Sequence, residues 1–282
     1  MSAADSVSMR DALYEAPGPR TRRRIVVGTV ITSVAIVAIV AWVVARLYEM
    51  GQFDSRYWYF FAQWSTWRFL LKGLVGTAEV ALCAGAIALV LGILFMLGRI
   101  SHNRVVSTVF RVIINFFRGI PSLLLIYFFF LVIPSYGIKM PSFWMLTLPI
   151  ALTASGVLAE VFRAGVNAVP KGQTEAAMSL GMTHGKITRK IVLPQALRIV
   201  IPSLVSQLVV VVKDTTVAYV VSYPDLMQNA RVLISNYDAL VSMYFVVALI
   251  YIAINYATNR FSIYLAHRSG AKIISRTEEN PV

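Results

Sequence analysis

Negative charge is scarce in this chain of 282 residues, which has 13 aspartates and glutamates against 26 lysines and arginines. Charged residues make up only 14% of the sequence and hydrophobic residues 58%, whereas soluble domains are about a quarter charged. The single cysteine, Cys83, excludes an intrachain disulfide and lies in an apolar run, where a thiol packs as a small side chain. Lipid is therefore the expected main solvent of the protein.

Motifs for catalysis and metal binding are also missing from the sequence. A nucleotide-binding P-loop needs G-x-x-x-x-G-K-[ST], but the one Gly-Lys pair, Gly185 and Lys186, is followed by Ile187. We find no Ser/His/Asp set and no paired catalytic carboxylates, and the three histidines stand far from any cysteine or carboxylate cluster. The sequence predicts neither an enzyme nor a metal protein, and no cofactor held by this chain.

Long uncharged apolar runs are the dominant feature instead. Residues 25–45 read IVVGTVITSVAIVAIVAWVVA, and at about 1.5 Å per residue such a helix crosses one hydrocarbon core. A cleaved signal peptide is the alternative, but the length of the run and its continuation into Arg46 favour a retained helix. Further membrane segments are predicted at 69–97, 120–133, 143–169, 193–212 and 240–265, of which 120–133 is short. The predicted fold is an all-α integral membrane protein with six transmembrane helices.

The basic residues predict an orientation for these segments. Lysines and arginines collect on cytoplasmic loops, and most of the 26 lie on the side that holds both chain ends. We therefore predict cytoplasmic N- and C-termini. The excess of basic residues is expected to face a membrane surface and not to bind nucleic acid. Residues 213–239 are expected to form a re-entrant or surface segment on the outer side. The predicted parts are a basic tail (1–24), an N-terminal helix (25–46), an aromatic outer segment (47–68), a five-helix core (69–266) and a second tail (267–282).

A polar loop interrupts the apolar pattern at residues 170–197, between the fourth and fifth segments. We expect a helix over residues 175–180, capped by Thr174 or Gln173, with Glu175 in the first turn and Gly181 ending it in a left-handed conformation. Pro194 would open the next helix near its first turn. This short helix would expose an Ala/Met/Leu face to a partner, and a plain membrane anchor is the alternative.

The spacing E-A-A-x3-G-x9-I-x-L-P in this loop resembles the signature cytoplasmic loop of bacterial ABC importer permeases. The likeness covers residues 69–266 and includes GLVGT (73–77), FRGIP (117–121), AEVFRAG (159–165), PKGQ (170–173) and KDTT (213–216). Together these are similar to the polar amino-acid permeases of bacterial plasma membranes, and most of all to glutamate permeases of high-GC Gram-positive bacteria. The resemblance implies a type I importer core of five helices, preceded here by one extra helix.

The resemblance also implies partners and a function. The partners are an ATPase dimer that binds ATP and Mg²⁺, a second permease, identical or related, an extracytoplasmic solute-binding protein and membrane lipid. The implied substrate is a polar amino acid, with glutamate or another acidic one favoured. A secondary transporter or channel driven by an ion gradient, or a non-transporting scaffold, would leave the long loop unexplained. The residues implied to couple to the ATPase are Glu175, Ala176, Ala177, Gly181, Leu193 and Pro194.

Five polar residues in or beside the segments are candidates for the substrate path. Glu160 and Arg163 lie three residues apart on one helix face, and each costs roughly 2.5–3.5 kcal/mol at mid-bilayer unless it is compensated. Glu160 either contacts the substrate or gates the pore, or it forms a structural ion pair with Arg163. Glu79 lies in the second segment. Asn115 and Ser122 flank a Gly/Pro break that is either a plain kink or part of a polar path.

Overall fold

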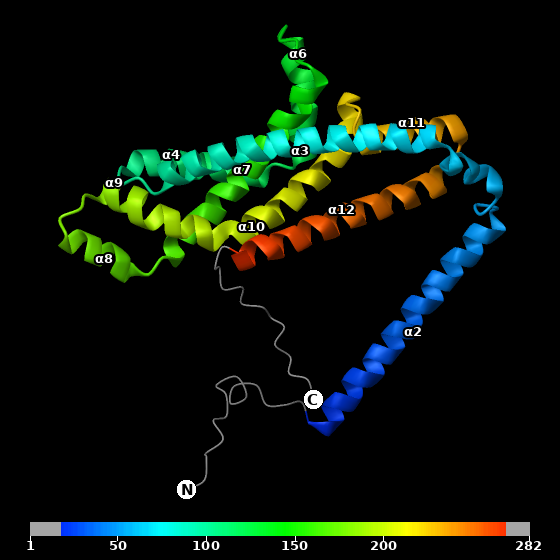
Figure 1. The fold of residues 1–282 in the computed structure, drawn as a ribbon, viewed down its shortest axis with the longest axis horizontal. Helices are drawn as coiled ribbons and strands as arrows, with labels where there is room; N and C mark the ends of the chain where they lie inside the picture. Colours follow the sequence, from blue (N-terminus) through cyan, green and yellow to red (C-terminus); the bar gives the residue numbers. More distant parts are fainter. Residues whose placement is uncertain (1–17, 269–282) are drawn as a thin grey trace. The chain divides into compact units, whose positions relative to one another are not determined.

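The computed structural model describes residues 18–268, and the regular elements in that range are all helical (Figure 1). Within it, five helices are long and apolar enough to cross a membrane, and a bent pair raises the number to six if the pair counts as one span. The predicted all-α membrane fold is confirmed, and the sixth span depends on that pair. The chain divides into two units, residues 1–58 and 59–282. The predicted tails lie largely outside the described residues.

The described part of the first unit consists of one long helix, a turn and a short 3-10 helix at Ser55–Tyr57. Helix α2 (Pro19–Glu49) has proline at its first position, where the missing N–H costs nothing. The helix therefore takes in Arg20 and the arginines up to Arg24, which the sequence analysis assigned to the tail. Near its end Arg46 forms an exposed ion pair with Glu49 at 2.9 Å. Gly51 then turns the chain with φ +68°.

The second unit is a bundle built around α7 (Ser142–Ala168). Helices α3 (Trp64–Arg99) and α10 (Leu193–Asp214) pack against α7, and α12 (Leu240–Arg268) packs against α10. Most buried residues of α7 between 151 and 159 are alanine, serine or glycine, with Thr153 and Leu158 as the exceptions, so neighbouring backbones approach closely. Figure 1 shows α8 (Lys171–Ser179) and α9 (His184–Ile187) at one end of the bundle and α11 (Leu226–Tyr237) at the other.

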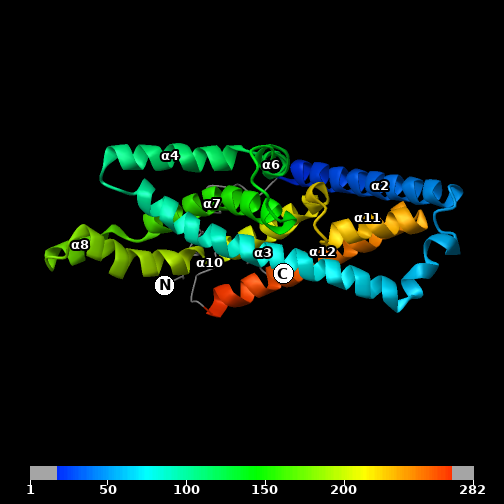
Figure 2. The ribbon, with the colours of Figure 1, turned by 90° about the horizontal axis from the view of Figure 1, so that it is seen from above.

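The bent pair starts at the α8 end of the bundle. Asn103 caps α4 (Arg104–Gly119) by accepting hydrogen bonds from the Val105 and Val106 amides at 2.9 and 3.3 Å. Both views show α4 running alongside α3 and α7 (Figures 1 and 2). The chain then bends by 96° into the stretch that begins with α5 (Ser122–Tyr127) and ends with α6 (Ile133–Ser135). Pro121 causes the break, because proline lacks the N–H and forces the residue before it into an extended conformation.

The helical path of α10 starts earlier than the sequence predicted. Helix α9, a π-helical turn at Thr188–Val192 and α10 follow one another without a break. Pro194 therefore lies inside a continuous helical run that begins at His184. Pro194 is in the first turn of α10, as predicted, but the π turn joins α10 to α9, so Pro194 does not begin a separate helix.

At the other end of the bundle, α11 is held closely against α3. The Thr77 hydroxyl accepts a hydrogen bond from the Leu226 amide at 3.1 Å, and the Asn229 side chain donates to the Phe69 carbonyl at 2.8 Å. A methyl group added to Gly76 would lie 2.5 Å from the Pro224 carbonyl oxygen. The contact therefore depends on glycine at this position.

Candidate functional site

The loop of residues 170–197 forms a helix, but its start differs from the prediction. Helix α8 begins at Lys171, directly behind Pro170, whose fixed φ prepares the chain for a helix. Neither Gln173 nor Thr174 is the capping residue, and Glu175 lies in the middle of the helix instead of its first turn. Gly181 adopts the predicted left-handed conformation with φ +72°.

Helix α8 has one buried side and one exposed side. Ala177 is only 2% exposed and packs with Val169, Ile187, Val192 and Ala196. Ala177 therefore anchors α8 to its own chain. Glu175, Ala176 and Met178 are exposed, and Leu180 just beyond the helix is 81% exposed. This exposed set, which we call the α8 face, is the part of the loop open to a partner.

The remaining loop residues of the prediction lie apart from the α8 face. Leu193 is partly buried against the main core, and Pro194 is exposed on the first turn of α10. The sequence did not predict that His102 and His184 meet, with ring centroids 5.1 Å apart. Both histidines line a groove of about 480 Å³ that Thr174 and Glu175 also border. Their separation of 82 positions in the sequence gave no signal of this contact.

Glu160 forms an ion pair with Arg163, one of the two alternatives that the sequence left open. The Nε and Nη2 atoms of Arg163 lie 2.8 and 2.7 Å from Oε2 of Glu160. Arg99, from the end of α3, approaches the other carboxylate oxygen at 3.9 Å. Arg118 of α4 also acts on the charge of Glu160. One carboxylate is thus surrounded by three guanidinium groups from three helices.

The other candidates for the substrate path occupy separate places. Glu79 accepts a hydrogen bond from the Tyr223 hydroxyl at 3.2 Å. Ser122 lies within hydrogen-bonding reach of the Asp214 carboxylate at the end of α10, and Asn115 is exposed on α4. The structure therefore distributes the five predicted residues along the bundle and does not gather them into one pocket.

A buried polar cluster near α11 was not predicted from the sequence. The Asp225 side chain is 0% exposed, and its Oδ1 accepts a hydrogen bond from the Gln228 amide at 2.7 Å. Its other oxygen has no partner among the described residues. Burial raises the pKa of the Asp225 carboxyl to about 6. Burial and the hydrogen bond to Glu79 raise the pKa of the nearby Tyr223 hydroxyl to about 12.

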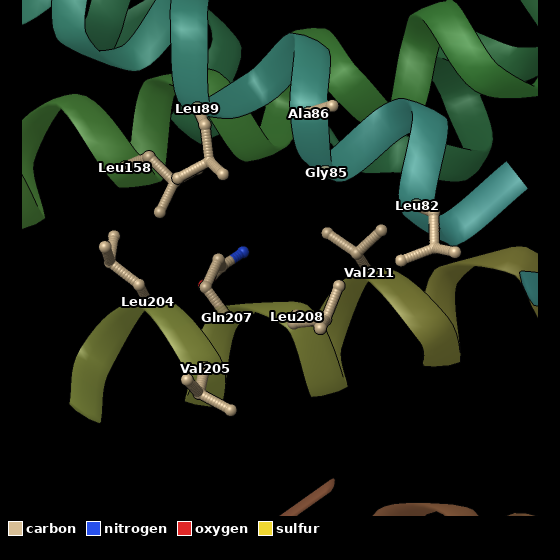
Figure 3. A pocket seen from close by; sticks show the side chains of 10 residues that line it. All are labelled: Leu82, Gly85, Ala86, Leu89, Leu158, Leu204, Val205, Gln207, Leu208 and Val211. Atoms are coloured by element: carbon tan, nitrogen blue, oxygen red, sulfur yellow. The ribbon is translucent and has the colours of Figure 1, made fainter. Parts of the chain in front are cut away.

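An apolar cleft of about 350 Å³ lies between α3 and α10. Figure 3 shows Leu82 and Leu89 of α3 opposite Leu204 and Leu208 of α10, with Leu158 of α7 at one side. Gln207 carries the one polar side chain of this lining. A zwitterion would lose its hydration here without replacement, so the cleft does not suit a polar amino acid.

The fold and these features define a multi-pass membrane protein in which two long spans are joined by an exposed helical loop. Residues 88–270 match the family of binding-protein-dependent transport system inner membrane components. The chain belongs to this family, and within it to the permeases of amino-acid ABC importers. Such permease subunits are not enzymes themselves, as the sequence predicted.

Individual relatives agree with this assignment. The glutamate transport system permease protein GluD of Corynebacterium glutamicum is 34% identical over 82% of this chain and 88% of the relative. The probable glutamine ABC transporter permease protein GlnP of Bacillus subtilis is also 34% identical, over 67% of this chain and 88% of its own length. A chain from the crystal structure of an amino acid ABC transporter with histidines superposes with a TM-score of 0.70 at 27% identity, covering 74% of this chain and 98% of that one.

Proposed function

We propose that this chain is the permease subunit of an ATP-driven uptake system for a polar amino acid, with glutamate or another acidic amino acid as the favoured substrate. Two such subunits, identical or related, form the translocation path. A dimer of ATPase subunits supplies the energy and binds ATP and Mg²⁺, and an extracytoplasmic binding protein delivers the substrate. The α8 end of the bundle is cytoplasmic, as are both chain termini.

The α8 face is the observation that carries this proposal. It joins a small exposed apolar surface to one carboxylate, Glu175, at the end of the bundle where most of the basic loops gather. Behind it, Ala177 packs with Ala196 of α10 and with Ile187 and Val192 in the helical run before α10. A push on the α8 face therefore moves the start of α10, which continues through the bundle to the α11 end. Such a connection lets ATP binding favour one arrangement of the bundle and hydrolysis the other.

Permease variants co-expressed with the ATPase and binding-protein subunits of the uptake system test the coupling role. We expect Glu175→Lys and Gly181→Val to abolish most uptake of labelled amino acid while the chain still inserts in the membrane. The first variant reverses the charge of the α8 face, and the second puts a β-branched residue at a left-handed position. Lys190→Gln, an exposed change in the same loop, is the matched control and should transport normally.

Affinity purification in mild detergent tests the partners directly. The tagged chain should recover a P-loop ATPase, and both coupling variants should lose it. Recovery of the chain alone, with unchanged solute uptake by both variants, would rule out the α8 face as the docking surface. The favoured substrate is tested by comparing uptake of glutamate, glutamine and arginine by the intact system.

A further inference from the structure

Helix α4 carries a row of arginines on one side. Arg104, Arg111 and Arg118 are seven residues apart, so they lie above one another about 10.5 Å apart along the helix. The three positions are exposed in the chain, and α4 contains no acidic residue. The remaining polar residues, Ser107, Thr108 and Asn115, lie close to the same side of the helix, and the other residues before Gly119 are valine, isoleucine or phenylalanine.

Part of the apolar side of α4 packs against the bundle, whereas Val105, Val112 and Phe116 are exposed. The Phe110 and Phe117 rings lie 6.1 and 6.3 Å from the Phe95 ring of α3, and Ile114 is fully buried. This packing determines the rotation of α4 about its axis. Arg104 and Arg111 are exposed beside this contact, and Arg118 lies at its edge against α7.

The Arg118 end of the row lies beside the middle of α7. The Arg118 side chain lies against Gly156, where an added methyl group would be 3.0 Å from the Arg118 Cγ atom. Gly156 is near the middle of α7, about 18 Å from the end of that helix at Ala168. An arginine near the membrane surface can extend to the headgroups, but one at this depth needs water or an anion.

Positive charge also exceeds negative charge around Arg118. Arg99, Arg118 and Arg163 surround the single carboxylate of Glu160. The Nη1 atom of Arg99 is buried and has no hydrogen-bond partner among the described residues. The cluster thus retains both charge and a hydrogen-bond donor for a further anion.

We propose that the arginine row of α4, with the cluster around Glu160 at its deep end, is a carboxylate-binding track that favours amino acids of net negative charge. This inference rests on the proposed transport function and names the residues that select the substrate class. The 10.5 Å spacing exceeds the reach of one small amino acid, so the substrate moves from one arginine to the next. Positive potential along the track raises the local concentration of anions.

Binding of radiolabelled glutamate and glutamine to the purified permease–ATPase complex, without any binding protein, tests the track. The two probes have the same shape and differ in one charge. We expect Arg111→Gln to weaken glutamate binding about tenfold and to leave glutamine binding unchanged, whereas Arg111→Lys retains most of the preference. Arg68→Gln removes an exposed arginine at the other end of the bundle and should behave as the wild type.

Other outcomes overturn the inference. Equal changes in the binding of glutamate and glutamine, or no change for either, would show that Arg111 does not distinguish substrates by their charge. Loss of co-purified anionic lipid in Arg111→Gln with unchanged glutamate binding would assign the row to headgroup phosphates. Recovery of the ATPase and transport of a neutral amino acid, without glutamate binding, would overturn the track while leaving the proposed function intact.

Discussion

Single charged side chains persist inside this bundle where other groups compensate them. Glu160 is the clearest case, because its carboxylate meets guanidinium groups from α7 and α3. The side chain of Glu160 is 19% exposed, so the pair is neither fully desolvated nor at the surface. Removing the Glu160 carboxylate should therefore lower stability as well as transport.

Glu160→Gln should lower the free energy of unfolding by about 2 kcal/mol, because it leaves Arg99 and Arg163 without their counter-charge. Thermal unfolding of the purified complex measures this loss. The double variant Glu160→Gln with Arg163→Gln should recover part of it, since the uncompensated charge is smaller. A single variant as stable as the wild type would show that the ion pair contributes nothing to the fold.

Asp225 gives a pH dependence that follows from its burial. Its pKa is raised from the ordinary value of 3.8 to about 6, so the folded chain holds the proton more tightly than the unfolded chain. The stabilisation that protonated Asp225 gives to the fold is therefore fully present below about pH 4. It is lost as the pH rises through 6, and above that pH the stability no longer changes with this group. A pKa difference of about two units corresponds to a stability difference of at most about 3 kcal/mol.

Asp225→Asn should remove this dependence, because asparagine also caps a helix and carries no charge. The melting temperature of the variant minus that of the wild type, measured from pH 4 to pH 8, should rise up to about pH 6 and then remain constant. Asp54→Asn, an exposed acid in the first unit, is the control and should show no such trend. A flat difference for Asp225→Asn would contradict the raised pKa.

At the scale of elements, the contact between α3 and α11 depends on close backbone approach. Gly76→Ala should cost about 1–3 kcal/mol in stability, because its methyl group overlaps the Pro224 carbonyl. Gly85→Ala is a matched change in the same helix, where the nearest atom, Leu208 Cδ1, is at an ordinary 3.5 Å. Chemical denaturation of the two variants should separate them clearly. Equal stability would mean that α11 shifts freely on α3.

Element boundaries also show where local signals compete. Thr174 and Glu175 form a plausible helix start in sequence, yet α8 begins at Lys171 because Pro170 initiates the helix before them. Gly181 was predicted correctly because only its own backbone conformation decides it. Pro194 lies in the first turn of α10 as predicted, but the sequence did not predict the π turn that joins α10 to α9.

At the scale of the whole molecule, the chain divides into two units. Residues 1–58 form one unit and residues 59–282 the other, and the family match begins at residue 88. The bundle contains the α8 face, the Glu160 cluster and the Asp225 cluster. We therefore expect the bundle to keep its orientation without α2.

A chain that starts at Tyr59 should insert with the α8 face on the cytoplasmic side, the orientation that we propose for the full-length chain. A cysteine at Ser179, exposed on α8, reports this through a membrane-impermeant maleimide, with Cys83 replaced by alanine. Labelling should require permeabilised cells for both lengths of the chain. Labelling of intact cells by the short form would mean that α2 determines the orientation.

The sequence by itself determined five of the six membrane segments, the presence of the helical loop and the left-handed turn at Gly181, whereas the segment at 120–133 belongs to a bent helix pair. Each depends on local composition or on the conformational range of one residue, so a short window contains the information. The structure alone decided the approach of Arg99 to Glu160, the meeting of His102 with His184, and the burial of Asp225. These arrangements join residues far apart in the chain, and they depend on how each helix is rotated and packed against its neighbours. Apolar segments of similar composition do not specify that rotation locally.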